Sequence, residues 1–143
     1  MFKIFSATAL AASLLALPTF AEPVEVQMMN KGMAGRMVFE PGIVRLQPGD
    51  TIQFLASDKT HNAATIKGMA PEGAAEFKGK INEEIAVTFD APGWYGVQCV
   101  PHFAMGMVLV VQVGDDPAPD NFLDLRLPKK AKDRFESTLA AAQ

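Results

Sequence analysis

Cysteine and histidine are scarce in this sequence: one cysteine, Cys99, and two histidines, His61 and His102, occur among 143 residues. A single cysteine excludes an internal disulfide, an iron–sulfur cluster held by four thiolates, and a binuclear copper centre that needs two bridging thiolates. A lone thiol in an oxidising compartment is a liability unless it is buried or bound to a metal. The presence of Cys99 therefore calls for a chemical explanation.

An excess of basic residues is also missing. Lysine and arginine number 13 against 16 aspartates and glutamates, which gives a formal charge of −3. A general nucleic-acid binder needs a basic face to neutralise phosphates, so the charge balance argues against that class. An apolar fraction of 49% and a charged fraction of 20% are typical of a globular protein, and the length suits one domain with a core.

Only the N-terminus carries a long apolar run. Lys3 is the sole charge in the first 21 residues, residues 4–18 are almost all apolar or small, and Thr19-Phe20-Ala21 ends the stretch. A basic start, an apolar run and a small-x-small site predict a secretory signal peptide over residues 1–21, cleaved after Ala21. A membrane anchor is the alternative, but Pro18 interrupts a run already short for crossing about 30 Å of hydrocarbon. Residues 22–143 are then the exported domain.

Residues 24–113 have the pattern of short strands separated by turns. Ile85, Val87 and Phe89 alternate with polar or small residues, which is the period of a half-buried strand. Pro-Gly turns occur at residues 47–50 and 91–93, and residues 107–113 form a nearly continuous apolar run. This spacing predicts a mainly β fold, an antiparallel sandwich or barrel.

The sequence changes character from about residue 115 onward. Residues 115–120 are acidic and rich in proline, and after Pro128 the apolar residues Ala131, Phe135 and Leu139 recur every four positions among charged ones. This periodicity predicts an amphipathic helix that begins near Pro128 and packs on the sandwich through Phe135.

The segment from Cys99 to Met107 places a thiolate, an imidazole and a thioether within nine residues. One thiolate, two imidazoles and a weak axial methionine are the donor set of a blue-copper site, and His61 is the only histidine left to supply the second imidazole. Thiolate and thioether favour copper, whereas this set would make a poor structural zinc site. The predicted cofactor is one copper ion, with His61, Cys99, His102 and Met107 as its ligands.

Residues 22–143 resemble, over essentially their whole length, the cupredoxin family of small blue-copper electron carriers; the resemblance rests on the C-terminal helical tail and on eight short segments. They are Asn30–Gly32, Met37–Pro41, Pro48–Asp50, Lys59–Asn62, Lys80–Glu83, Tyr95–Val97, Cys99–His102 and Met105–Met107. The resemblance implies an eight-stranded Greek-key sandwich followed by two C-terminal helices, the first over residues 120–125. It also implies that His61, Cys99 and His102 are the strong copper ligands, that Met107 is the long axial one, and that Asn62 joins the two ligand loops through hydrogen bonds.

The resemblance further implies a periplasmic electron-transfer protein rather than an enzyme. Its implied partners are redox proteins, with a copper-containing nitrite reductase of denitrification as acceptor and a cytochrome c as donor. Docking would use an apolar patch around His102, ringed by lysines; the patch is Met37, Pro101 and Met105, and the ring is Lys31, Lys59, Lys78 and Lys80. Two alternatives remain, a copper carrier without redox turnover and a Cys–His thiol enzyme, and neither should show a reversible visible chromophore.

Overall fold

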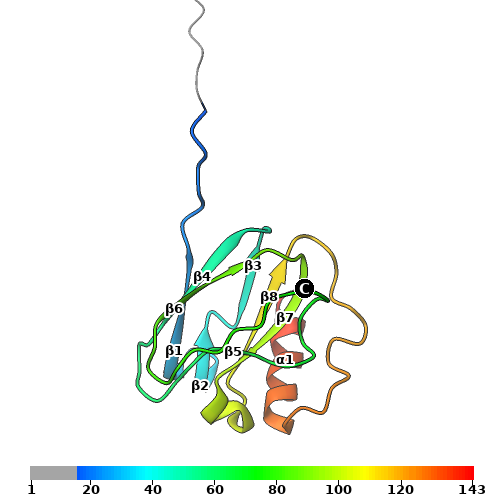
Figure 1. Cartoon of the computed structure of the whole chain (residues 1–143). Helices are drawn as coiled ribbons and strands as arrows, with labels where there is room; N and C mark the ends of the chain where they lie inside the picture. The colour runs from blue at the N-terminus through cyan, green and yellow to red at the C-terminus, as the bar shows by residue number, and fades with distance from the viewer. Residues whose placement is uncertain (1–15) are drawn as a thin grey trace, which may run out of the picture.

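A computed structural model describes residues 16–143, which form a β-sandwich with one helix against its outer face (Figure 1). The strands are β1 (Val24–Gly32), β2 (Gly35–Glu40), β3 (Ile43–Leu46), β4 (Asp50–Leu55), β5 (Ala64–Thr65), β6 (Ile85–Phe89), β7 (Gly93–Gln98) and β8 (Val108–Val113). A 3-10 helix, η1 (Val100–Met105), joins β7 to β8, and the helix α1 (Lys129–Ala141) ends the fold.

The eight strands make two four-stranded sheets, ordered β2-β1-β4-β6 and β3-β8-β7-β5. From β2 to β7 the chain changes sheet at every connection. These crossings bring β1 beside β4 and β3 beside β8 in parallel, while the other pairs are antiparallel. The expected eight-stranded sandwich is therefore confirmed, whereas a purely antiparallel arrangement was wrong.

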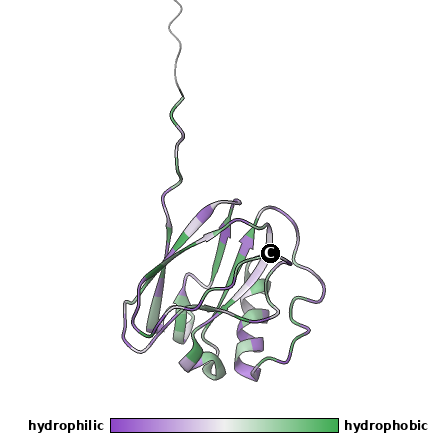
Figure 2. Cartoon of the chain, viewed as in Figure 1, coloured by the Kyte–Doolittle hydropathy of each residue, from purple (hydrophilic) through white to green (hydrophobic). Residues whose placement is uncertain are grey.

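The main core lies between the two sheets, where side chains of alternate residues point inward. Val26 and Met28 on β1, Ile52 and Phe54 on β4, and Leu109 on β8 are all fully buried. The predicted alternation of residues 85–89 is also present, with Ile85 and Val87 packed against this core and Phe89 inside it. Figure 2 shows hydrophobic and hydrophilic residues mixed along the strands and along α1.

A second core fills the space between the outer face of the β8 sheet and α1. Val108 and Val110 point to this side, whereas Leu109 and Val111 point into the main core. Burial on both faces explains why this stretch is apolar without alternation. From α1, the fully buried Ala131 and Phe135 reach the second core, which confirms the amphipathic helix predicted after Pro128.

The second helix expected over residues 120–125 is absent from the described chain, and a turn occupies its place. The turn is closed by hydrogen bonds from Phe122 N to Pro119 O (3.0 Å) and from Asp124 N to Asn121 O (3.0 Å). A segment of six residues does not repay the cost of helix nucleation. Phe122 nevertheless packs on Phe135, with ring centroids 6.2 Å apart.

Candidate metal centre

Two loops at one end of the sandwich carry the predicted ligands. His61 lies between β4 and β5, while Cys99 directly follows β7 and His102 lies within η1. Figure 1 shows η1 at this end, beside one end of α1. Chain segments 38 residues apart in sequence are therefore brought together by the crossing between the sheets.

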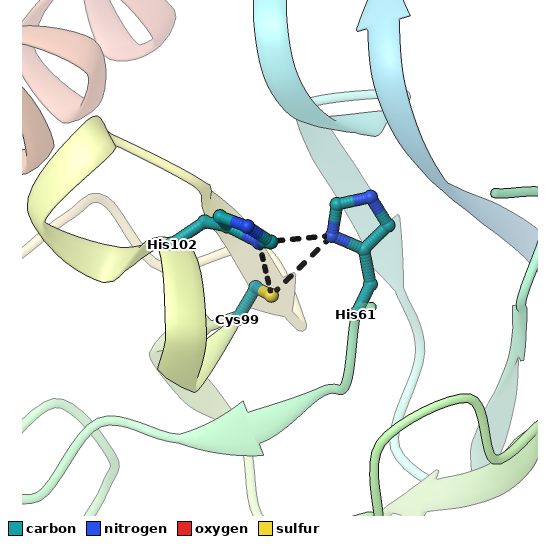
Figure 3. A group of neighbouring side chains, drawn as sticks. All are labelled: His61, Cys99 and His102. Atoms are coloured by element: carbon teal, nitrogen blue, oxygen red, sulfur yellow. Dashed lines mark hydrogen bonds between the residues drawn. The ribbon is translucent and has the colours of Figure 1, made fainter. Parts of the chain in front are cut away.

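The three side chains point toward one another (Figure 3). Cys99 Sγ lies 3.6 Å from His61 Nδ1 and 3.5 Å from His102 Nδ1, and the two ring nitrogens are 3.1 Å apart. The centre of such a triangle is about 2 Å from each atom, which is the distance at which first-row metals bind nitrogen and sulfur. The donor set and its spacing fit a copper ion.

Burial differs among these side chains. His61 and Cys99 have no exposed surface, whereas His102 is partly exposed. Burial lowers the pKa of His61 below its ordinary value of 6.5; the charge of His102 acts in the same direction and Asp58 acts against it. Burial also raises the pKa of the Cys99 thiol, while backbone N–H groups of Asn62 and His102 lower it. A metal that binds Cys99 as thiolate must displace this proton.

Asn30 on β1 fixes the orientation of the His61 ring. Its Oδ1 lies 2.8 Å from His61 Nε2, and because an amide oxygen only accepts, Nε2 carries the proton and donates. The lone pair of His61 is then on Nδ1, the atom that faces Cys99. Asn30 is itself held through its backbone N–H, which donates to Asp58 Oδ2 at 2.7 Å. Sequence reasoning gave Asn30 no role, although it lies in the family segment Asn30–Gly32.

Asn62 joins the two loops, as the resemblance implied. Its Oδ1 accepts the backbone N–H of Val100 at 2.7 Å, and its Nδ2 donates to the carbonyl of Gly79 at 3.0 Å. The side chain is 2% exposed, so both bonds are shielded from water. The residue next to His61 is thus bonded to the residue next to Cys99, and the expected role of Asn62 is confirmed.

The second loop is closed mainly by its own backbone. Cys99 N donates to Met107 O (3.0 Å), and Met107 N donates to His102 O (3.2 Å). Gly106 has φ +89, and a Cβ there would lie 2.8 Å from the carbonyl oxygen of Lys130 on α1. Only glycine fits at this close approach. The contact with α1 therefore fixes how closely the Cys99–Met107 loop packs against the helix. Met107 follows directly and is fully buried in the main core.

The predicted docking residues surround this end of the fold. The four lysines Lys31, Lys59, Lys78 and Lys80 are all exposed. Lys78 and Lys80 border an open hollow together with Ile81, Val100 and Pro101. Ile81 is 47% exposed, and Met105 and Val100 are each 42% exposed, so apolar surface lies next to basic charge. Met37 is partly buried and packs on the main core, so it offers less surface than Met105.

Comparison with known proteins gives a consistent result. The family described as copper binding proteins, plastocyanin/azurin family, matches residues 26–114. The pseudoazurin of Paracoccus pantotrophus is 54% identical over 141 residues, covering 94% of this chain and 95% of the relative. The crystal structure of pseudoazurin from Methylobacterium extorquens AM1 superposes with a TM-score of 0.79 at 46% identity, covering 85% of this chain and 100% of that one. Native pseudoazurin from Hyphomicrobium denitrificans gives a TM-score of 0.77 at 38% identity, covering 84% and 98%.

A two-sheet sandwich with a His–Cys–His cluster between its end loops, two of its three side chains buried, defines a cupredoxin, a protein built to hold copper. The matches are specific enough to go one step further. This chain belongs to the plastocyanin/azurin family of copper-binding proteins and, within it, to the pseudoazurins. Pseudoazurins are type 1 copper proteins that transfer electrons and are not enzymes, and copper is accordingly the cofactor of this chain. Among residues 16–143, no helix is long and apolar enough to cross a membrane.

Proposed function

We propose that His61, Cys99, His102 and Met107 are the four ligands of one copper ion in this chain. The observation that carries this assignment is the clustering of the two Nδ1 atoms and Sγ within 4.8 Å of one another. Met107 is added because its backbone is bonded to both Cys99 and His102 and its side chain is fully buried. Bound copper supplies one-electron chemistry by alternating between Cu(I) and Cu(II).

The chain's own residues hold the donor atoms in place. Asn30 sets the tautomer and rotation of His61, and Asn62 fixes the distance between the two ligand loops. Such fixed ligands move little when the metal changes charge, which favours rapid electron exchange. The burial of Cys99 and His61 argues against a copper carrier, because a carrier must release its metal from exposed donors.

We further propose that the protein carries electrons to a periplasmic reductase of denitrification, a copper-containing nitrite reductase in particular, and receives them from a cytochrome c. Support comes from the partly exposed His102, which lies at the end of the fold where Lys59, Lys78 and Lys80 are exposed. A basic docking face on a protein of net charge −3 steers an acidic partner while keeping the complex short-lived.

Export is part of this proposal. The predicted signal peptide covers residues 1–21, of which residues 1–15 lie outside the described part of the chain. The described remainder supports it, because Leu17 and Phe20 are 82% and 91% exposed and lie outside both cores. Mass spectrometry of the exported protein should give a chain that begins at Glu22; a chain that retains Leu17 would contradict cleavage after Ala21.

Replacement of the thiolate tests the copper site most directly. The copper-loaded protein should have a strong visible absorption from charge transfer between Cys99 sulfur and Cu(II). Cys99→Ser should remove this band while circular dichroism still reports a folded β protein, because most side chains of the two cores are not proposed copper ligands. A band that persists in the serine variant would mean that Cys99 is not a ligand.

A further inference from the structure

Thr60, the residue before His61, has an unusual backbone conformation. Its φ is +77°, in the left-handed region where a β-branched side chain is strained. Such a conformation persists only where the surroundings impose it, and it is often found beside functional groups. Thr60 is exposed, so packing of its side chain does not impose it.

Two hydrogen bonds of Asn82, which lies in the connection between β5 and β6, impose this conformation on Thr60. Its Oδ1 accepts the backbone N–H of Thr60 at 2.6 Å, and its own backbone N–H donates to the carbonyl of His61 at 2.8 Å. The two bonds therefore hold the peptide group before Thr60 and the peptide group after His61. Asn82 itself has φ +65°, which asparagine tolerates better than most residues.

The segment that carries Asn82 is fixed independently of His61. Lys80 N donates to Glu83 Oε2 at 2.6 Å and Glu83 N donates to Lys80 O at 3.1 Å, which closes a turn around Asn82. Just before this turn, Gly79 N donates to Ala63 O at 2.9 Å. Asn82 therefore lies in a hydrogen-bonded turn, and from this turn it holds the backbone of Thr60 and His61.

We propose that Asn82 is a positioning residue for the metal centre: it holds Thr60 in a strained backbone conformation and thereby fixes the backbone of His61, so that Nδ1 of His61 faces Cys99 before the metal binds. This inference rests on the proposed role of His61 as a copper ligand. Asn30 fixes the rotation of the ring, whereas Asn82 fixes the backbone from which the ring projects.

Asn82→Gly is the sharpest variant, because glycine keeps the backbone donor and the positive φ, while loss of the side chain removes the Oδ1 that accepts the Thr60 N–H. In the metal-free protein, amide hydrogen exchange at Thr60 should become about threefold to tenfold faster, the effect of one lost hydrogen bond. Asn82→Asp keeps an acceptor and should retain the slow exchange. In the copper-loaded protein, Asn82→Gly should shift the reduction potential and broaden the visible band.

Thr60→Gly tests the strain itself. Glycine adopts φ +77° freely, so Thr60→Gly added to Asn82→Gly should restore much of the original band shape and potential. Asp50→Gly is the matched control: it removes a similar bond, Gln47 N to Asp50 Oδ2 at 2.9 Å, at the opposite end of β4, and should leave the potential unchanged.

An Asn82→Gly protein with unchanged potential and band shape would overturn the positioning role, whether or not its stability falls. The copper assignment is tested separately by His61→Gly. If that variant keeps the visible band, the proposed site is wrong; if it loses the band while Asn82→Gly changes nothing, only the positioning role fails.

Discussion

The two ligand loops are built in opposite ways. The loop of His61 is held by other parts of the protein: its ring is bonded to Asn30 on β1, and its backbone is bonded to Asn82. The loop of His102 is held mainly by itself, through hydrogen bonds among Cys99, His102 and Met107. Within residues 16–143, the ring of His102 has polar contacts with His61 and Cys99 only.

This difference separates two tasks that an electron carrier has to perform. The fully buried His61 is fixed by Asn30 and Asn82 and sets the geometry of the centre. His102 is partly exposed and has backbone angles of −118° and 17° that interrupt η1, so its ring reaches toward the surface. We infer that the first loop provides rigidity and the second provides a route for electrons.

The largest loss should come from breaking the link between the loops. Asn62→Ala leaves the N–H of Val100 and the carbonyl of Gly79 without their buried partner, which should cost about 2 kcal/mol of unfolding free energy. The visible band should also shift, because the loops are free to separate. Urea denaturation and the absorption spectrum measure both effects. Gln53→Ala removes a half-buried amide on β4, outside both ligand loops. It should change the free energy of unfolding and the visible band less.

The second prediction compares two methionines of the same loop. Met107→Leu should still bind copper but with a raised reduction potential, because loss of a weak axial donor disfavours Cu(II). Met105 is 42% exposed and Met107 is fully buried, so Met105→Leu should change the potential less. Voltammetry of the two variants decides the matter; an equal or larger shift at Met105 would mean that the axial ligand was wrongly chosen.

The sequence predicted well those features that depend on local pattern or on a rare residue type. The alternation in residues 85–89 and the four-residue period of α1 follow from burial of one face, and the scarcity of histidine left one choice for the second imidazole. The turn at residues 120–123 was taken for a helix because the family resemblance, and not a local periodicity, suggested it.

Contacts between distant segments could not be read from the sequence. Arg134 on α1 donates to the carbonyls of Met37 (3.0 Å) and Arg36 (3.2 Å), 97 and 98 residues away. Asn30 and Asn82 are similar cases, since each is a common turn or strand-end residue until the fold brings it to His61. Hydrogen bonds of this kind depend on the crossing of the chain between sheets.

A smaller effect should appear in the metal-free protein as the pH falls. Burial holds the pKa of His61 below 6.5 in the folded state, so above that pH neither the folded nor the unfolded state binds the proton. Below pH 6.5 the unfolded state binds a proton at His61 and the folded state does not. The free energy of unfolding therefore decreases until the pH reaches the folded-state pKa. Urea midpoints between about pH 8 and about pH 5.5 should fall more steeply for the wild type than for His61→Gln. Parallel curves would show that His61 does not resist protonation.

The smallest effect, and the one most sensitive to salt, concerns the exposed lysines that are predicted to dock a partner. Lys59 is exposed and lies two residues before His61, so it can act on a partner without altering the buried ligand. If electrons leave through His102 toward an acidic partner, Lys59→Glu should lower the second-order rate of electron transfer to a copper nitrite reductase at low salt. The difference should fade as ionic strength rises, because surface charges are screened over about 10 Å at 0.1 M salt. Arg45→Glu is the same charge reversal on β3, where Arg45 pairs with Gln112 of β8 away from the ligand loops, and should lower the rate less. Stopped-flow rates measured against ionic strength for the three proteins give the test, and a Lys59→Glu curve that coincides with the wild type at low salt would remove Lys59 from the docking surface.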